Sequence, residues 1–379
     1  MKKNVSKILV GLLVVLCMVE GFFLYKAYVI PNDTLKTAQK INQIEKTVQE
    51  YYKGNIDENQ MEEYTYKGLI AGLGDVYSDY YTKKEFESLM ETTDGAFSGI
   101  GLYLTQDTTS MNITAVKTIK GTPCYGSGIK KGDTLAKVDG KSIAGEKLED
   151  VVKKIKGKEG TKVTLTFKRD GVSKPMEYTF TRKNVEVQTV ETKMMDGGIG
   201  YLSISEFDKV TVKQFENGIK KLEKQGMKSL IIDLRDNPGG LLDAVVEIAN
   251  DILPKGKIVY TKDKQGNQKN YNSDNKDRLE IPLCVLVNGN SASAAEILAG
   301  AMKDRKAGTL IGEKTFGKGI VQGFYDLQDG SYLKLTYASY YTPAGHNIHK
   351  KGIKPDITVK NNEKTKTDEQ LQRAVKELK

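Results

Sequence analysis

The strongest constraint on the fold of this 379-residue chain is a plan that occurs twice in its second half. Each copy is an apolar run of strand length, a polar turn and then a helix. The copies read SLIIDLRDNPGGLLDAVVEIANDIL from residue 229 and PLCVLVNGNSASAAEILAGAMKD from residue 282. Strands that alternate with helices predict an α/β core whose functional turns gather at the strand ends. We therefore expect both polar turns to face one crevice.

The length exceeds what one hydrophobic core usually supports, so several globular units are expected. We divide the chain into a cytoplasmic start with a membrane anchor, a helical arm, a small glycine-rich β-domain, the α/β core and a polar helical tail. These segments cover residues 1–32, 33–95, 96–184, 185–360 and 361–379. The expected fold class is thus α/β in the core and α+β over the whole multidomain chain.

Charge and cysteine content exclude several classes of function. The net charge of +9 comes mostly from lysines scattered through the sequence, and no basic block with interleaved aromatic residues occurs. We interpret it as surface charge, with no nucleic-acid partner. Cys17, Cys124 and Cys284 form neither a metal-ligand cluster nor an obvious disulfide framework. No metal and no cofactor are expected.

An apolar segment near the start predicts the compartment. Residues 8–30 are interrupted only by Glu20 and Lys26 and follow three lysines. The length suits a membrane span, and the basic start would keep the N-terminus in the cytoplasm, with the rest of the chain outside. A cleaved signal peptide, and hence a secreted protein, is the alternative, but no convincing small-x-small cleavage site follows. Lipidation of Cys17 is not expected, because a lipoprotein signal needs a small residue where Leu16 stands.

The stretch from residue 33 to residue 90 reads as helices, with Leu35, Ile41, Ile44 and Val48 at roughly helical spacing. A glycine-containing sequence, GLGDVYSDYY from residue 72, punctuates it. We interpret most of this arm as a packing and spacer element between membrane and body. The arm also offers a surface for a homodimer.

Residues 97–183 contain a glycine-flanked strand, a second strand, a short helix, a strand pair, an amphipathic helix and an alternating strand. This order resembles a PDZ domain, with GIGL as its carboxylate loop. The resemblance implies that Gly99, Ile100, Gly101 and Leu102 bind the C-terminal carboxylate of a protein partner, whose tail adds a strand to a sheet edge. A small β-domain without a ligand is the alternative.

A serine nucleophile in the second polar turn would need a base. The chain has only two histidines, His346 and His349, in a TPAGHNIH segment typical of a turn or a surface. They could in principle complete a Ser-His-Asp arrangement, because triads join residues far apart in sequence. The short spacing between them argues weakly against that role.

Lysine is the other candidate base, provided that burial removes it from water, because a free lysine is protonated at neutral pH. The segment GEKTFGKGIVQ offers Lys314 and Lys318. Lys318 has a glycine on either side, which lets the backbone approach a site closely. Gln322, four residues further on, is a neutral group that can orient an amine without stabilising the ammonium.

The residue pattern alone leaves the nucleophile open. Ser293 and Glu296 fit the capping box S-x-x-E, which would make Ser293 a helix cap and Ser291 a loop residue. A helix start also favours the negative charge that develops during acyl transfer. Both interpretations fit the spacing.

The segment NGNSAS to GKGIVQ resembles the active-site region of the carboxy-terminal processing peptidases, also called tail-specific proteases. LGDVYSDY at residues 73–80, DLRDNPGG and YYTPAGHNIHKKGIKPDI extend the resemblance over about residues 33–359. It implies a crotonase-like core after a PDZ domain. It also implies that Ser293 attacks, Lys318 takes its proton and Gln322 orients Lys318. Ala295, where the family often has serine, affects no catalytic role.

The same resemblance places an oxyanion hole at the backbone amides of Gly239 and Ala294, with Gly240 as the alternative to Gly239. The expected function is a membrane-anchored, outward-facing serine endopeptidase that binds protein C-termini through its PDZ domain, and in related peptidases the PDZ unit can restrain the site until a tail binds. The alternatives are a catalytically silent PDZ scaffold and a crotonase-type acyl-CoA enzyme.

Overall fold

A computed structural model describes residues 15, 17–21, 32–274, 279–361 and 367–379. It forms two units, Met1–Gly68 and Leu69–Lys379. Among the described residues, no helix is both long enough and apolar enough to cross a bilayer. The span predicted at residues 8–30 lies mostly outside the described residues. It therefore stays a prediction.

The predicted helical arm consists of α2 (Asn32–Tyr51), α3 (Glu58–Ala71) and α4 (Lys83–Asp94), but it also contains a strand, β1 (Asp79–Tyr81). Within the first unit, Ile41, Ile56 and Met61 line a groove between α2 and the start of α3. The strand was not expected. Helical spacing does not extend over the tyrosine-rich GLGDVYSDYY sequence, and β1 is stabilised by pairing with a strand more than 250 residues later.

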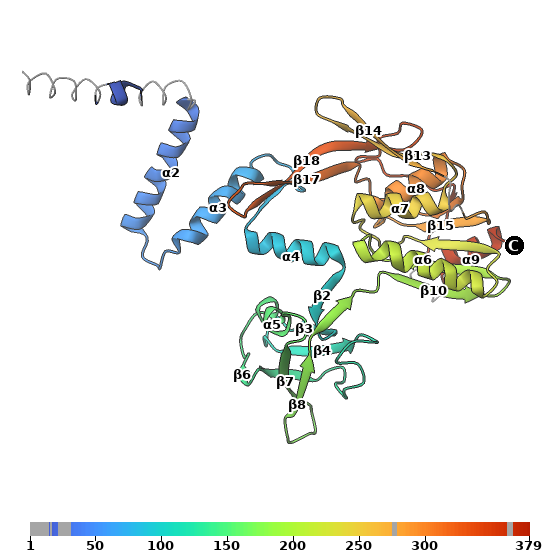
Figure 1. Cartoon of the computed structure of the whole chain (residues 1–379), viewed down its shortest axis with the longest axis horizontal. Coiled ribbons are helices and arrows are strands. Elements are labelled where there is room, and N and C mark those ends of the chain that lie inside the picture. Colours follow the sequence, from blue (N-terminus) through green and yellow to red (C-terminus); the bar gives the residue numbers. More distant parts are fainter. Residues whose placement is uncertain (1–14, 16, 22–31, 275–278, 362–366) are drawn as a thin grey trace, which may run out of the picture. The chain divides into compact units, whose positions relative to one another are not determined.

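The core sheet of the second unit is built from the repeated plan (Figure 1). Its strands are, in spatial order, β10 (Val190–Met195), β11 (Ile199–Ile204), β12 (Ser229–Asp233), β15 (Leu283–Val287), β16 (Thr309–Gly312) and β19 (Ile357–Thr358). All neighbours are parallel except β10 and β11. The predicted alternation of strands and helices is confirmed.

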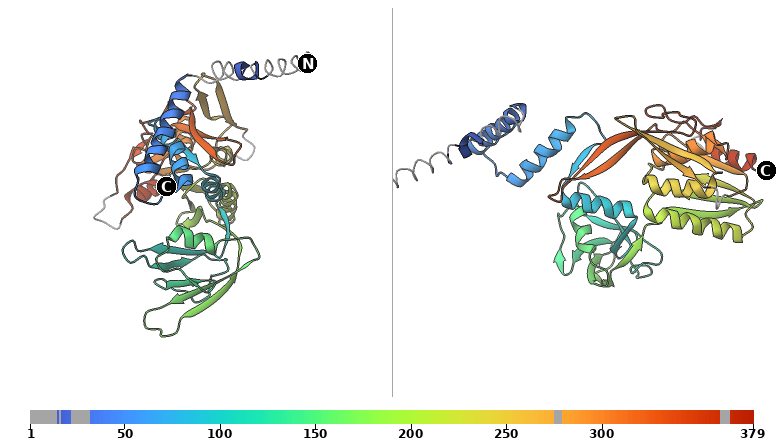
Figure 2. Two further views of the ribbon diagram at one scale, coloured as in Figure 1. Left: turned by 90° about the vertical axis from the view of Figure 1, so that its left-hand side faces the viewer. Right: turned by 45° about the horizontal axis from the view of Figure 1, so that its top comes forward.

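Both faces of this sheet are covered, as a parallel sheet requires. The helices are α6 (Lys209–Lys224), α7 (Leu242–Ile252), α8 (Ala294–Asp304) and α9 (Glu369–Glu377). Helices α6, α7 and α8 follow one another in contact (Figures 1 and 2) and share a core with Leu230 and Ile232. Ile231 points to the other face and packs with Ala374 of α9. The apolar run of β12 is thus buried on both sides.

A second sheet lies beside the core helices. It contains β1, β18 (Tyr332–Tyr341), β13 (Gly256–Asp263) and β14 (Gln268–Ser273) in that order, with β17 (Ile320–Asp326) also paired to β18. Tyr80 of β1 lies opposite Leu333 of β18. The end of the arm is therefore part of the second unit, and it brings residues 72–78 to the same sheet as β17.

The PDZ-like domain has its own sheet and its own core. Its elements are β3 (Leu102–Gln106), β4 (Ile113–Thr118), β5 (Thr134–Val138), β6 (Lys141–Ser142), α5 (Leu148–Ile155), β7 (Lys162–Lys168) and β8 (Met176–Thr181). The antiparallel strands β2 (Ala96–Gly99) and β9 (Lys183–Glu186) lie at the start and the end of this domain and link it to the rest of the chain. The core includes Val151, Leu165 and Phe167 and, among the described residues, shares none with the core of the α/β sheet. The strands and the amphipathic helix α5 follow the order expected for a PDZ domain, but the short helix expected between β4 and β5 is wrong: that segment consists of turns.

Candidate active site

Ser293 stands at the start of α8, directly after the turn that follows β15. Its backbone has φ 54° and ψ −114°, a conformation that costs energy for any residue with a side chain. Its hydroxyl makes no N-cap hydrogen bond, and the residue is partly exposed. The backbone amide of Ser293 is bound by Glu296 at the helix start, and the residue itself stays partly exposed.

Ser291 occupies a different environment. It is fully buried, its Oγ donates to the Leu234 carbonyl at 2.8 Å, and the same Oγ accepts the Asn288 amide at 3.0 Å. These contacts join the turns after β12 and β15. Ser291 therefore stabilises the turn, as expected for a loop residue.

A buried carboxylate connects the Ser293 turn to the Lys318 loop. Glu296 accepts hydrogen bonds from the amides of Ser293 (3.0 Å), Gly317 (2.8 Å) and Lys318 (2.8 Å), and from the hydroxyl of Thr315 (2.5 Å). The capping box predicted only the first of these contacts. The other three fix the loop between β16 and β17 against the N-terminus of α8.

Tyr340 of β18 makes a second connection between the same segments. Its buried hydroxyl lies 3.0 Å from the Ser293 carbonyl oxygen and 2.5 Å from the Lys318 carbonyl oxygen. Tyr340 is the first residue of the YYTPAG motif that extends the family resemblance, but the sequence analysis assigned it no role.

Lys318 is partly buried, whereas Lys314 is exposed. Burial lowers the pKa of the Lys318 amine, nearby Lys334 lowers it further, and Asp75 opposes both effects. The Nζ atom lies 4.5 Å from the ring centroid of Tyr77. Within the described residues, no hydrogen bond joins the amine to Ser293 or Gln322. The loops that carry Ser293 and Lys318 are therefore joined, but no hydrogen bond links the two side chains in the described residues.

Gln322 lies on β17 and points to a neighbouring strand. Its Nε2 donates to Thr336 Oγ1 at 3.1 Å. The Thr336 amide donates to Ser78 Oγ at 3.0 Å, and that hydroxyl donates to Asp75 at 2.6 Å. Gln322 is thus the end of a polar chain that leads to the LGDVYSDY segment.

The turn after β12 lies against Ser293. A Cβ atom on Gly239 would be 2.7 Å from the Ser293 Cβ and 3.0 Å from the Ala294 nitrogen, so only glycine fits there. The Gly239 amide donates to Asn237 Oδ1 at 2.8 Å. The amides of Ala294 and Gly240 have no hydrogen-bond acceptor in the part of the chain that the structure describes. This geometry favours Ala294 and Gly240 as the free donors.

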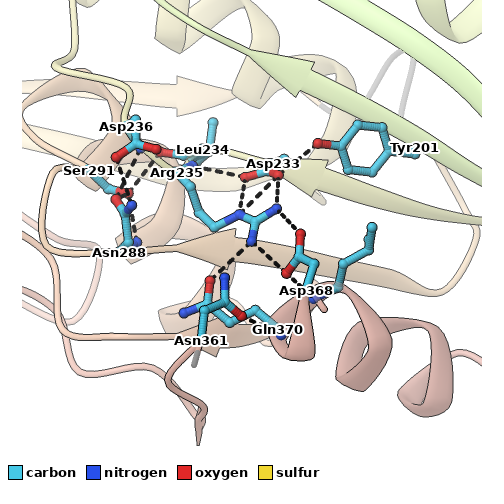
Figure 3. Close-up of polar contacts among 11 residues, drawn as sticks. Tyr201, Asp233, Leu234, Arg235, Asp236, Asn288, Ser291, Asn361, Asp368 and Gln370 are labelled. Carbon is cyan, nitrogen blue, oxygen red and sulfur yellow. Dashed lines mark hydrogen bonds and ion pairs between the residues drawn. The ribbon is translucent and has the colours of Figure 1, made fainter. Parts of the chain in front are cut away.

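Asp236 ties the two polar turns together. Its Oδ1 accepts the side-chain amides of Asn288 (2.9 Å) and Asn290 (2.8 Å), and its backbone amide donates to Asn288 Oδ1. Figure 3 shows Asp236, Asn288 and Ser291 gathered where the turns meet. The two polar turns therefore meet at the ends of β12 and β15, as expected, while the crevice between them stays a prediction.

Arg235 anchors the same turn to the end of the chain (Figure 3). Its guanidinium contacts Asp233 at 2.6 Å and binds both carboxylate oxygens of Asp368 at 2.8 Å. Tyr201 donates to Asp233 at 2.7 Å. Asp368 is the N-cap residue of α9. The C-terminal helix is therefore connected to the segment that carries the oxyanion-hole candidates.

The two histidines lie in different environments. His346 is exposed. His349 packs against Gly319, where a Cβ atom would be 2.5 Å from the His349 nitrogen. No hydrogen bond between a histidine and Ser293 occurs among the described residues. In the same residues, no group of three or more His, Cys, Asp or Glu side chains is placed to hold a metal ion.

The PDZ loop lies between β2 and β3. Ile100 is buried, and Gly101 has φ 75° with the Thr122 side chain where a Cβ would be. The carbonyls of Ile100 and Gly101 accept the amides of Cys124 and Ile119 at 3.0 and 2.9 Å. Strand β3, which starts at Leu102, pairs with β4 on one side only. The loop is thus held by its carbonyls beside an open strand edge.

Comparison with known proteins identifies both parts of the chain. The profile of peptidase family S41 matches residues 198–359, and a PDZ domain profile matches residues 98–179. A probable CtpA-like serine protease of Staphylococcus aureus (strain COL) is 36% identical over 362 residues, which cover 92% of this chain and 72% of the relative. Its counterpart from Staphylococcus saprophyticus is 38% identical over 328 residues, covering 86% of this chain and 66% of the relative.

One solved structure is similar over nearly the whole chain. The photosystem II D1 C-terminal processing protease superposes with a TM-score of 0.51 at 29% identity, and the match covers 94% of this chain and 96% of that chain. The fold similarity includes both the core and the PDZ-like domain.

Proposed function

This chain belongs to peptidase family S41 and is a serine peptidase with a PDZ domain; from that premise we propose that Ser293 and Lys318 carry out its chemistry. The observation that carries the proposal is the joint anchoring of both residues by Glu296 and Tyr340. The family resemblance and the partial exposure of Ser293 support the assignment of the nucleophile. The lowered pKa of the partly buried Lys318 supports its role as base.

In the proposed reaction, the neutral Lys318 amine takes the proton of Ser293 as Oγ attacks the carbonyl carbon of the scissile peptide bond. The amides of Ala294 and Gly240 stabilise the oxyanion; Gly239 could replace Gly240 if its bond to Asn237 breaks. Lys318 then gives its proton to the leaving amine. Water hydrolyses the acyl-enzyme in the second half of the reaction, with Lys318 again as the base.

The Lys318 amine must turn to form a hydrogen bond with Ser293 before this chemistry begins, because in the structure it makes no such bond and lies over the Tyr77 ring. We assign Gln322 the role of orienting the amine after that movement. Its present bond to Thr336 holds the side chain on the β17 strand beside the site. A neutral amide suits this role because it does not stabilise the ammonium.

The test is replacement of each residue. Ser293→Ala and Lys318→Ala should each lower kcat/KM by about a thousandfold or more, because the two act as a unit. Lys318→Arg should be equally inactive, since arginine keeps its proton. Labelling of Ser293 by a fluorophosphonate separates a peptidase from a silent scaffold or an acyl-CoA enzyme. Full activity of Ser293→Ala with loss in Ser291→Ala would reverse the assignment of the nucleophile.

We propose that the substrates are proteins recognised by their C-terminal tails. The open edge of β3 and the loop at Gly99, Ile100, Gly101 and Leu102 support this role. A tail can activate the enzyme only if it binds one state of the PDZ domain more tightly than the other. At concentrations below saturation, a substrate with a free C-terminus should be cleaved faster than its amidated form. Equal rates would reject tail recognition by this loop.

We further propose a single-pass anchor at residues 8–30, with the peptidase outside the cytoplasm, and an arm that can form a homodimer. The support is the mostly apolar character of the segment, which only Glu20 and Lys26 interrupt, and the basic residues before it. Protease treatment of intact spheroplasts should digest the body of an anchored protein and leave a cytoplasmic control untouched. Recovery of the mature protein from the medium would instead indicate secretion. Light scattering of the body with and without residues 32–68 tests the dimer.

A further inference from the structure

The LGDVYSDY segment reaches the active site through one aromatic ring. Tyr77 places its ring centroid 4.5 Å from Lys318 Nζ. The turn that carries it is well anchored: Asp75 accepts the Tyr77 amide at 3.1 Å and the Ser78 hydroxyl at 2.6 Å, and Ser78 accepts the Thr336 amide of β18 at 3.0 Å. The ring is therefore held at a fixed place beside the amine.

An aromatic face attracts an ammonium but has no comparable attraction for a neutral amine. The Tyr77 ring thus favours the protonated form of Lys318. Other charged groups act on the same amine: Asp75 favours the proton, and Lys334 on β18 disfavours it. Glu296 binds the Lys318 backbone amide, and His349 packs behind Gly319. Tyr77 and Asp75 belong to one turn, so this turn as a whole holds the charged lysine.

We propose that Tyr77 is a positioning residue that holds protonated Lys318 over its ring in a resting state without a hydrogen bond to Ser293. The base becomes active when it loses its proton, leaves the ring and turns toward the serine. This inference rests on the proposed role of Lys318 and adds to it a residue from a segment that sequence analysis treated as a spacer. Tyr77 touches no reacting atom of the substrate in this scheme.

Loss of the ring should make the base available at lower pH. The ring stabilises only the ammonium, so its removal lowers the pH at which Lys318 loses its proton. From the usual strength of a cation–π contact, the acidic limb of the activity profile should move down by about 0.5 to 1.5 pH units. At pH values below the acidic limb, the ring-free variant should react roughly three- to thirtyfold faster than the wild type. This ratio of rates expresses the same pH shift.

The first experiment measures the rate of fluorophosphonate labelling of Ser293 against pH. Tyr77→Leu should show the downward shift, and Tyr77→Phe, which keeps the ring, should restore the wild-type limb. Tyr77→Met provides a second ring-free variant should the leucine variant fail to fold. Tyr64→Leu removes an exposed ring 5.9 Å from Lys67 and is the matched control, with no shift expected. An unchanged or upward-shifted limb in folded ring-free variants would overturn the proposal.

A second experiment observes the lysine directly. In a Ser293→Ala background, competitive acetylation with acetic anhydride followed by mass spectrometry reports the fraction of Lys318 that is neutral at each pH. Removal of the ring should increase that fraction at neutral pH, and a purely structural role of Tyr77 would not. Lys318→Ala distinguishes a wrong assignment of the base from a wrong role for Tyr77. If that variant is labelled normally, the proposed base is wrong; if it is silent while Tyr77→Leu shows no shift, only the role of Tyr77 is wrong.

Discussion

At the scale of single residues, Glu296 is the group on which the geometry of the site most depends. It is fully buried and accepts four hydrogen bonds from two segments. Glu296→Gln would place an NH2 group against donors and leave some of them without an acceptor. We expect a loss of about 2–4 kcal/mol in the free energy of unfolding and slower labelling of Ser293. Urea denaturation measures the first effect.

The matched control for this change is Glu216→Gln. Glu216 forms an exposed pair with Lys220 on α6, 3.7 Å apart, and such pairs contribute little. Its variant should unfold within about 0.5 kcal/mol of the wild type. A Glu296→Gln protein as stable and as reactive as this control would show that the four hydrogen bonds do not hold the site.

Asp208, at the start of α6, predicts a dependence of stability on pH. Burial, together with the charge of Glu206, raises the pKa of Asp208 to about 6. The folded chain therefore binds this proton more tightly than the unfolded chain. The contribution of this proton to the free energy of unfolding is complete below about pH 4. It is lost as the pH rises through about 6, and the loss is on the order of 1–3 kcal/mol.

Asp208→Asn should remove this dependence, because asparagine does not titrate and still caps a helix. The variant should be more stable than the wild type at pH 7, and the difference between their free energies of unfolding should be smaller at pH 4.5. Urea unfolding at the two pH values measures it. An identical pH dependence in both proteins would contradict the assignment of this effect to Asp208.

At the scale of elements, α9 is attached to the turn after β12 by a bidentate ion pair and one further hydrogen bond. Asp368 binds the partly buried guanidinium of Arg235, which also donates to Gln370 and contacts Asp233. Asp368→Asn keeps the N-cap but removes the charge that faces Arg235. We expect a loss of about 1–3 kcal/mol in stability and faster amide hydrogen exchange in α9.

Glu377→Gln is the control on the same helix. It breaks the i,i+4 pair with Arg373, which lies near the surface at 2.8 Å. This change should cost no more than about 0.5 kcal/mol. Equal hydrogen exchange of α9 in the two variants would indicate that packing of Ala374 and its neighbours, and not Arg235, holds the helix.

At the scale of the whole molecule, the separate cores predict separate unfolding events. Leu165 is fully buried in the PDZ core. Leu165→Ala should lower the stability of that domain by about 2–5 kcal/mol. In calorimetry, one transition should move down while the transition of the catalytic core stays in place. A common shift of all transitions would mean that the two cores unfold together.

The distribution of charge differs from the sequence-based expectation of lysines spread evenly. Residues 97–183 contain 17 Lys or Arg and 9 Asp or Glu, an excess of 8 out of the chain's net charge of +9. Nearly all of the net charge thus lies on the PDZ domain, and the remaining chain is almost neutral. The net charge of the whole chain therefore does not show that the excess of positive charge is concentrated in residues 97–183.

Sequence patterns by themselves determined the elements and the family. The apolar runs of β12 and β15, each followed by a helix, predicted the α/β core, because burial imposes a periodicity that is visible in a single sequence. The strands and the amphipathic helix of the PDZ-like domain were predicted in the same way, whereas its expected short helix is a series of turns. The motifs also singled out Ser293 and Lys318, which stay predictions until variants are tested. Hydrophobic periodicity did not predict β1, since a three-residue strand depends on its partner β18.

Only the tertiary structure decided how the site is held. Glu296 was visible as a cap, but its contacts with Thr315, Gly317 and Lys318 cross about twenty residues of sequence. Tyr77 meets a lysine more than 200 residues away. Spacing encodes neighbours on one helix or strand, whereas these hydrogen bonds and the cation–π contact depend on how separate elements pack. The physical reason is that packing brings together groups whose separation in the sequence carries no period.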